Sequence, residues 1–161
     1  MNSVYTWTER FKAVTKHISD LSLWVIRIWL AQEFLYASYQ KLSGGFTPPE
    51  WFSDLRFPLP FSLLPATLNW GMVGVTELIF GLALLLGLFS RLSALILLIV
   101  TYVAVYSVHF DLSWSGWNQI ETEDGLGFKV PLMIGIMLLV VLGQGAGRWS
   151  LDRWICYLKR G

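Results

Sequence analysis

Four long apolar stretches, separated by polar or proline-rich segments, dominate the pattern of hydrophobic and polar positions along the chain. They cover residues 21–39, 70–89, 92–110 and 128–143. A helix that crosses a bilayer needs about 20 mainly apolar residues; the first three stretches supply them, and the fourth must borrow from its flanks. Such a helix satisfies its own backbone hydrogen bonds within hydrocarbon. The pattern therefore predicts one all-α domain over residues 1–161, a polytopic membrane protein built as a four-transmembrane-helix bundle.

The two ends of the chain have the periodicity of amphipathic helices, with apolar residues at steps of three and four. These residues are Val4, Trp7, Phe11, Val14 and Ile18 at the amino terminus, and Leu151, Trp154, Ile155 and Leu158 at the carboxyl terminus. Ser150 stands where the second helix needs an N-cap. We expect both helices to lie in the membrane interface as anchors. The first 18 residues carry too many charges for a cleavable signal peptide.

Lysines and arginines are concentrated in the two terminal segments and beside the short connection between the second and third stretches. Most acidic residues lie instead in the two longer connections, residues 42–69 and 111–127. Because cytoplasmic segments are enriched in lysine and arginine, both termini are predicted to lie in the cytoplasm, and the chain in the inner (cytoplasmic) membrane. The connection 42–69 is rich in proline and aromatic residues, which predicts a lid at the outer interface.

The amino-acid composition indicates which surroundings and which classes of ligand the chain is expected to have. The chain is 55% hydrophobic and only 14% charged, whereas an ordinary soluble domain has about 25% charged residues, so the expected surroundings are lipid. A net charge of +1 gives no reason to expect nucleic acid. The single cysteine, Cys156, excludes an intrachain disulfide, and the two histidines fall on opposite sides of the predicted bundle, so no metal site is predicted.

Three charged residues interrupt the apolar stretches. Arg27 and Glu33 lie in the first stretch and Glu77 lies in the second. A charge in the middle of a transmembrane helix costs about 2.5–3.5 kcal/mol, so we expect each to face the interior of the bundle with a partner. A helical rise of about 1.5 Å per residue places Glu33 and Glu77 at similar depth in the outer half, and Arg27 nearer the inner surface.

Polar and aromatic residues near these charges outline a pocket beneath the predicted lid. They are Tyr36 and Lys41 in and after the first stretch, and Tyr102, Tyr106 and His109 in the third. Gly74 and Gly81 share a helical face with Glu77 and let a neighbouring helix approach closely. Less specific interpretations are open: Glu77 in a structural ion pair, the tyrosines as interface anchors, and His109 as a solvated residue at a helix end.

Three motifs, in order along the chain, resemble those of the DoxX family of integral membrane proteins. TELIFGLALLLGLFSR, from Thr76 to Arg91, resembles the family pattern E-x-x-x-G…G-x-x-x-R. Arg27 followed by FLYASYQKL is similar to the first-helix pattern, with Ser38 where the family usually has glycine, and GAGRWSLD at 145–152 is similar to the closing motif. The segment 107–120 is similar to the HvfX-like branch, found beside genes for modified copper-binding peptides.

The resemblance implies a four-helix membrane bundle and, for some relatives, a subunit of a thiosulfate:quinone oxidoreductase. The chain is then expected to be at most a quinone-binding subunit, with a quinone as its cofactor and no metal or covalent group. Glu77 or Glu33 would accept the quinol proton. Candidate quinone contacts are Lys41, Arg27, Tyr36, Tyr102, Tyr106 and His109, and candidate structural residues are Gly74, Gly81, Gly87 and Arg91.

Two alternatives belong to other classes of protein. In the first, the chain is a non-enzymatic membrane partner in the maturation, export or copper handling of a secreted modified peptide, and its aromatic outer connections dock that partner. In the second, it is a small transporter, which would require several copies because four helices leave little room for a pathway. Either hypothesis, like the first, expects a protein partner or a second copy of the chain.

Overall fold

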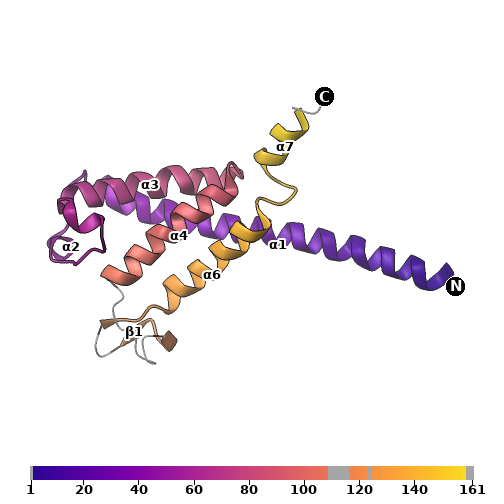
Figure 1. Cartoon of the computed structure of the whole chain (residues 1–161), viewed down its shortest axis with the longest axis horizontal. Helices are drawn as coiled ribbons and strands as arrows, with labels where there is room; N and C mark the ends of the chain where they lie inside the picture. The colour runs from indigo at the N-terminus through magenta and orange to yellow at the C-terminus, as the bar shows by residue number, and fades with distance from the viewer. Residues whose placement is uncertain (1, 109–116, 123–124, 159–161) are drawn as a thin grey trace.

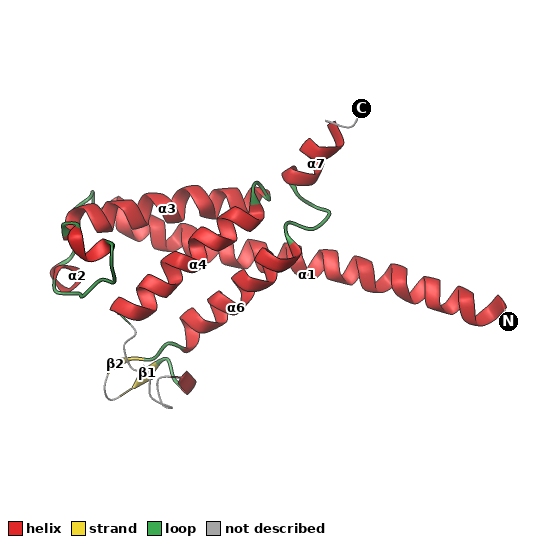
Figure 2. Cartoon of the chain, in the orientation of Figure 1, coloured by secondary structure: helices red, strands yellow, loops and turns green. Residues whose placement is uncertain are grey.

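The computed structural model describes residues 2–108, 117–122 and 125–158 (Figure 1). The helices are α1 (Asn2–Ser43), α2 (Glu50–Ser53), the 3-10 helix η1 (Phe61–Leu63), α3 (Ala66–Leu86), α4 (Ser90–Ser107), α6 (Lys129–Gln144) and α7 (Leu151–Leu158). Two strands of two residues, β1 (Glu121–Thr122) and β2 (Gly125–Leu126), pair antiparallel before α6. Figure 2 shows that the described residues are otherwise helical or in loops, as the sequence predicts for an all-α chain.

Four helices, α1, α3, α4 and α6, form the body of the protein. α1 packs against α3, α3 against α4, and α4 against α6, while α6 also contacts α1. Their shared core consists of fully apolar side chains from all four helices, namely Leu30, Phe34, Leu84, Ala94, Leu97, Leu138 and Val141. Burial of such side chains holds the helices together at one end of the body.

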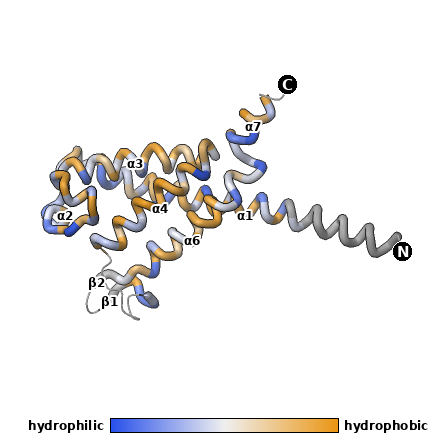
Figure 3. Tube along the Cα trace, in the orientation of Figure 1, coloured by the Kyte–Doolittle hydropathy of each residue, from blue (hydrophilic) through white to orange (hydrophobic). Residues whose placement is uncertain are grey.

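Two helices, α3 and α4, are long and apolar enough to cross a membrane, and α6 is apolar but shorter. Figure 3 shows that most positions along these helices are hydrophobic. Apolar side chains also face outward from the core, with Ile79, Ile99 and Ile136 about half exposed. A soluble protein rarely leaves so continuous an apolar surface in water. The fold is therefore that of a helical membrane protein.

The helix boundaries correct several expectations from the sequence. The interfacial helix predicted for residues 1–18 is wrong as a separate element, because α1 runs without a break from Asn2 to Ser43. No glycine or proline interrupts these residues, so nothing in the backbone stops the helix. α3 and α4 begin earlier than predicted and end three residues earlier, whereas α6 lies within one residue of its predicted position.

The connection between α3 and α4 is a tight turn built on Gly87. Gly87 has φ +71°, in the left-handed region, and the Leu88 amide donates to the Ala83 carbonyl at 2.8 Å. This pattern is the common way of ending a helix at a glycine. We call this side of the body, which also carries α7, the turn end.

The opposite side of the body carries residues 44–65, which we call the lid segment. α2 and η1 lie in this segment, and the buried ring of Phe52 packs on Trp70 near the start of α3, with ring centroids 4.7 Å apart. The Asn69 side chain donates to the Phe61 carbonyl at 2.9 Å and ties η1 to the same helix. Residues 44–65 therefore form a packed segment over one end of α3, and we call this side the lid end.

Candidate functional site

A buried ion pair joins α1 to α3 near the lid end. The Lys41 ammonium donates to both carboxylate oxygens of Glu77, at 2.8 Å and 3.1 Å. The Glu77 side chain is 6% exposed and that of Lys41 18% exposed, so the pair is largely removed from solvent. Taking two charges out of water costs several kcal/mol per ion, and the short, two-point contact offsets part of that cost.

Small residues bring the two helices close enough for this contact. A Cβ on Gly74 would lie 3.2 Å from the Lys41 Cβ, and one on Gly81 would lie 3.3 Å from the Leu35 side chain. The Ser38 hydroxyl, fully buried, donates to the Gly74 carbonyl at 2.8 Å. Ser38 therefore adds a hydrogen bond at a position where a glycine would only let the two helices approach closely, and the structural role of Gly74 and Gly81 stays a prediction.

Aromatic side chains cover the pair on the lid side. The Trp70 indole donates to the Lys41 carbonyl at 3.1 Å, and the Lys41 ammonium lies 5.9 Å from the centre of the Trp70 ring. A cation near the face of a tryptophan is stabilised by the ring. Trp51 and Phe52 then pack on Trp70, which connects the lid segment directly to the charged pair.

The pair combines a hydrogen-bond donor with a proton acceptor. The third contact of the Lys41 ammonium is its longest, 3.4 Å to the Ala37 carbonyl, and is the easiest to exchange for a ligand oxygen. Glu77 can gain a proton if a second charge or ligand displaces Lys41. Such chemistry, in a site shielded from bulk water, suits the binding and protonation of a small polar group on an apolar molecule.

Arg27 serves a different part of the molecule. It is 1% exposed, and it lies 14 residues from Lys41 in α1, which corresponds to about 21 Å along the helix. Its guanidinium donates to four carbonyls, those of Leu84 at 3.1 Å, Leu85 at 3.1 Å, Ala146 at 2.6 Å and Trp149 at 3.0 Å. The last carbonyls of a helix have no partner within it and carry negative partial charge, so Arg27 caps α3 and joins it to residues 146–149.

Asp152 completes this arrangement at the turn end. Its carboxylate accepts hydrogen bonds from the amides of Phe89 at 2.8 Å and Ser90 at 3.1 Å, while its own amide donates to the Gly87 carbonyl at 3.0 Å. A carboxylate at the start of α4 satisfies free amides and opposes the helix dipole. We call Arg27, Gly87 and Asp152 the inner clamp. Sequence reasoning missed the role of Asp152, although GAGRWSLD pointed to it.

Gly87 is required at the inner clamp for two reasons. Its φ of +71° disfavours any residue with a Cβ, and a Cβ there would lie within 2.5 Å of the Arg27 Nη2 atom and 2.7 Å of the Ser150 Cβ atom. Ser150 caps α7 as predicted, since its hydroxyl accepts from the Arg153 amide at 3.4 Å. The predicted structural role of Gly87 therefore has a specific geometric basis.

The other candidate residues do not converge on the Lys41–Glu77 pair. Tyr36 and Tyr102 are each 61% exposed on the outside of the body, and Tyr106 is 42% exposed. Glu33 is half-buried, and within the described residues its side chain makes no hydrogen bond or ion pair. Arg91 donates to the Gly143 carbonyl at 3.3 Å at the turn end. His109 lies outside the described residues.

The described residues also bear on metal binding. Among residues 2–108, 117–122 and 125–158, no three histidine, cysteine, aspartate or glutamate side chains lie close enough together to hold a metal ion. The acidic groups at the turn end are held by backbone amides and by Arg148, whose Nε atom lies 3.7 Å from Asp20.

Comparison with known proteins identifies one family model and two relatives that match the chain. The family model described as DoxX matches residues 22–110, which include both Lys41 and Glu77. An uncharacterized protein of Haemophilus influenzae is 41% identical over 139 residues, covering 85% of each chain. An uncharacterized membrane protein of Mycobacterium tuberculosis is 31% identical over 131 residues, covering 80% of this chain and 77% of that protein. No solved structure matches the chain.

Proposed function

This chain belongs to the DoxX family, and we propose that it is a multi-pass protein of the inner membrane in which α1, α3, α4 and α6 form a four-helix transmembrane bundle. α3 and α4 supply two candidate spans, and the 16 residues of α6 reach about 24 Å at the helical rise. Both termini lie beyond the turn end (Figure 1), where lysines and arginines are frequent, which supports cytoplasmic termini. α7 and the start of α1 would then anchor the protein at the inner surface.

The natural single cysteine offers a direct test of this topology. Cys156 is exposed at the turn end, so a membrane-impermeant maleimide should label it in inverted membrane vesicles and not in intact spheroplasts. Ser53, exposed in the lid segment, provides the matched control, because Ser53→Cys in a Cys156→Ser background should show the opposite pattern. Labelling of both positions from the same side would contradict the proposed orientation.

We further propose that the protein is the quinone-interacting subunit of a membrane oxidoreductase. The observation that carries this proposal is the largely buried Lys41–Glu77 pair under the aromatic lid segment. An ionisable pair within the membrane is expensive, and such pairs commonly mark a binding site or a proton path. The purely structural alternative is that the pair only holds α1 to α3, and the two hypotheses differ in whether a ligand responds to the charges.

A quinone head group needs an apolar surface, a hydrogen-bond donor for its carbonyl oxygen, and a group that exchanges protons with the reduced form. A groove of about 550 Å³ along α3, lined by Phe46, Leu68 and Met72 among others, offers the apolar surface. Lys41 offers the donor and Glu77 the proton acceptor. Neither Lys41 nor Glu77 lines the groove, but Thr76, the residue before Glu77 in α3, does, so a head group in the groove would have to reach past Thr76 to contact the pair.

A bound quinone would accept two electrons and two protons, the electrons coming from a redox-active partner subunit. In this scheme Lys41 would orient the quinone oxygen, and Glu77 would relay the two protons one at a time between the quinone oxygens and water. The lid segment keeps the pair dry, which strengthens both interactions. The exposed Tyr36, Tyr102 and Tyr106, with His109 and Glu33, are assigned no direct part in this step.

The proposal predicts that the purified protein binds a quinone. Addition of the soluble analogue decylubiquinone to the protein in detergent should raise its melting temperature and quench tryptophan fluorescence in a saturable way. Glu77→Gln, which keeps the shape of the side chain, should weaken this response, whereas Glu50→Gln in the lid segment should leave it unchanged. A wild-type protein that shows no saturable response would contradict the proposal.

A second candidate function is that of a non-enzymatic membrane partner for a secreted peptide or protein. The observation in its favour is the exposed apolar part of the lid segment, where Trp51 is 55%, Leu59 76% and Leu63 77% exposed. Such residues suit a docking surface. Photo-crosslinking from position 63 in native membranes should capture a discrete partner that is lost with Trp51→Ala. Crosslinks to lipid alone would exclude this function.

A further inference from the structure

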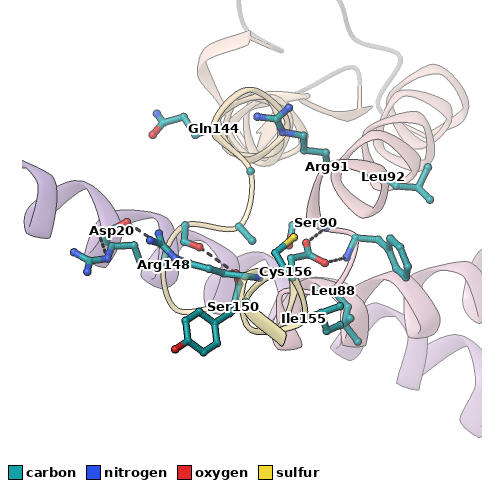
Figure 4. A pocket seen from close by; sticks show the side chains of 17 residues that line it. Asp20, Leu88, Ser90, Arg91, Leu92, Gln144, Arg148, Ser150, Ile155 and Cys156 are labelled. Carbon is teal, nitrogen blue, oxygen red and sulfur yellow. Dashed lines mark hydrogen bonds and ion pairs between the residues drawn. The ribbon is translucent and has the colours of Figure 1, made fainter. Parts of the chain in front are cut away.

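We propose that the turn end contains a binding site for the head group of an anionic phospholipid. The site is distinct from the Lys41–Glu77 pair, and it does not depend on whether the protein binds a quinone. It lies in an open cavity of about 1030 Å³ between the start of α4, the segment after α6, and α7 (Figure 4). Three arginines, Arg91, Arg148 and Arg153, line this cavity.

The charges within the cavity leave it basic. Two carboxylates, Asp20 and Asp152, line the same space, but each already has a partner. Asp152 accepts from two backbone amides, and Asp20 accepts from the Arg148 amide at 3.3 Å and faces the Arg148 guanidinium. Within residues 2–108, 117–122 and 125–158, the Arg91 side chain donates only to a backbone carbonyl, and the Arg153 side chain has no hydrogen bond or ion pair. Arg91 and Arg153 are therefore the cations available to an added anion.

The position of the cavity matches the level of lipid head groups. α3 ends at Leu86, α4 begins at Ser90 and α6 ends at Gln144, so three apolar helices terminate around it. The boundary between hydrocarbon and water must fall near such shared ends. Basic pockets between transmembrane helices at this level are suited to phosphate-bearing lipid head groups.

The walls of the cavity favour a lipid over a free phosphate ion. Leu88, Leu92 and Ile155 line it beside the arginines, and Leu92 is 50% exposed on the outer surface of α4. An acyl chain leaving the head group could follow this apolar surface of α4, which a free anion would not use. Arginine also binds phosphate oxygens through paired, charge-assisted hydrogen bonds. Charge and apolar surface together therefore point to an anionic phospholipid.

The test measures lipid retention by the full-length protein in detergent. Delipidated protein is mixed with dioleoylphosphatidylglycerol or with dioleoylphosphatidylcholine, and bound lipid is counted by native mass spectrometry. We expect preferential retention of phosphatidylglycerol. Loss of each available arginine should weaken phosphatidylglycerol binding about fivefold, the equivalent of about 1 kcal/mol, so Arg153→Gln should lose about fivefold and the double variant Arg91→Gln, Arg153→Gln about 25-fold.

Two controls keep the outcome decisive. Lys129→Gln removes an exposed lysine away from the turn end and should not change retention. If the double variant does not fold, Arg153→Gln and Arg153→Glu decide the question, because the exposed Arg153 side chain makes no hydrogen bond or ion pair within the described part of the chain. Equal retention of both lipids, equal retention by Arg153→Glu and wild type, or full displacement of phosphatidylglycerol by millimolar inorganic phosphate would each overturn the proposal.

Discussion

Removal of one partner of the Lys41–Glu77 pair should destabilise the protein more than removal of both. At the observed 2.8 Å, two unit charges attract each other by about 6 kcal/mol in a medium of effective dielectric constant near 20. Most of that attraction offsets the cost of desolvation. Once one partner is removed the other charge stays buried alone, so Lys41→Met and Glu77→Leu should each cost about 3–5 kcal/mol.

The double variant Lys41→Met, Glu77→Leu leaves no buried charge and should lie within about 1 kcal/mol of wild type, because apolar pairs of similar volume replace buried ion pairs with little loss. The assay is unfolding in mixed micelles with increasing dodecyl sulfate, followed by tryptophan fluorescence. The chain has nine tryptophans, so the signal is strong. Lys129→Met is the control and should change stability by less than about 0.5 kcal/mol. A double variant that loses as much stability as the two single variants together would show that the two charges do not compensate each other.

Three further predictions concern residues that fix the helices. Gly87→Ala should lower the free energy of unfolding by about 2 kcal/mol or more, because the new Cβ would meet a left-handed backbone and collide with Arg27. Gly143→Ala, in open space, is the control and should not destabilise the protein. Thermal melting in detergent compares the two variants. Arg27→Lys should cost about 2–3 kcal/mol because an ammonium cannot reach four carbonyls from two segments, and hydrogen exchange at residues 146–152 should rise. Ser38→Ala should cost about 1 kcal/mol, and unchanged melting of that variant would show that its bond to the Gly74 carbonyl contributes nothing.

The positions of the helices could be predicted because the length and apolar composition of each segment indicate a helix without reference to the rest of the chain. Apolar length alone located α3, α4 and α6 to within a few residues, and the cost of a membrane charge singled out Glu77 before its partner was known. The break expected after residue 18 was wrong because amphipathic periodicity reports which face is apolar and not where a helix ends. Glycine, proline, capping residues and tertiary contacts supply that information.

The candidate site could be predicted only in part. Sequence spacing shows that Tyr102 and Tyr106 share a face of α4, but it does not say toward which neighbour that face turns, and the structure turns it outward. The hydrogen-bond partners of Arg27 could not be predicted from the sequence for a different reason. They are backbone carbonyls, which every residue carries, from segments more than 50 positions away in the chain.

Quinone binding to the charge-free double variant distinguishes a Lys41–Glu77 pair that binds a quinone from one that only packs α1 on α3. Wild type and Lys41→Met, Glu77→Leu protein are reconstituted in lipid nanodiscs, matched for folded content, and titrated with decylubiquinone. We expect saturable binding to wild type and at least tenfold weaker binding to the double variant. Equal binding by the two proteins, or none by either, would contradict it.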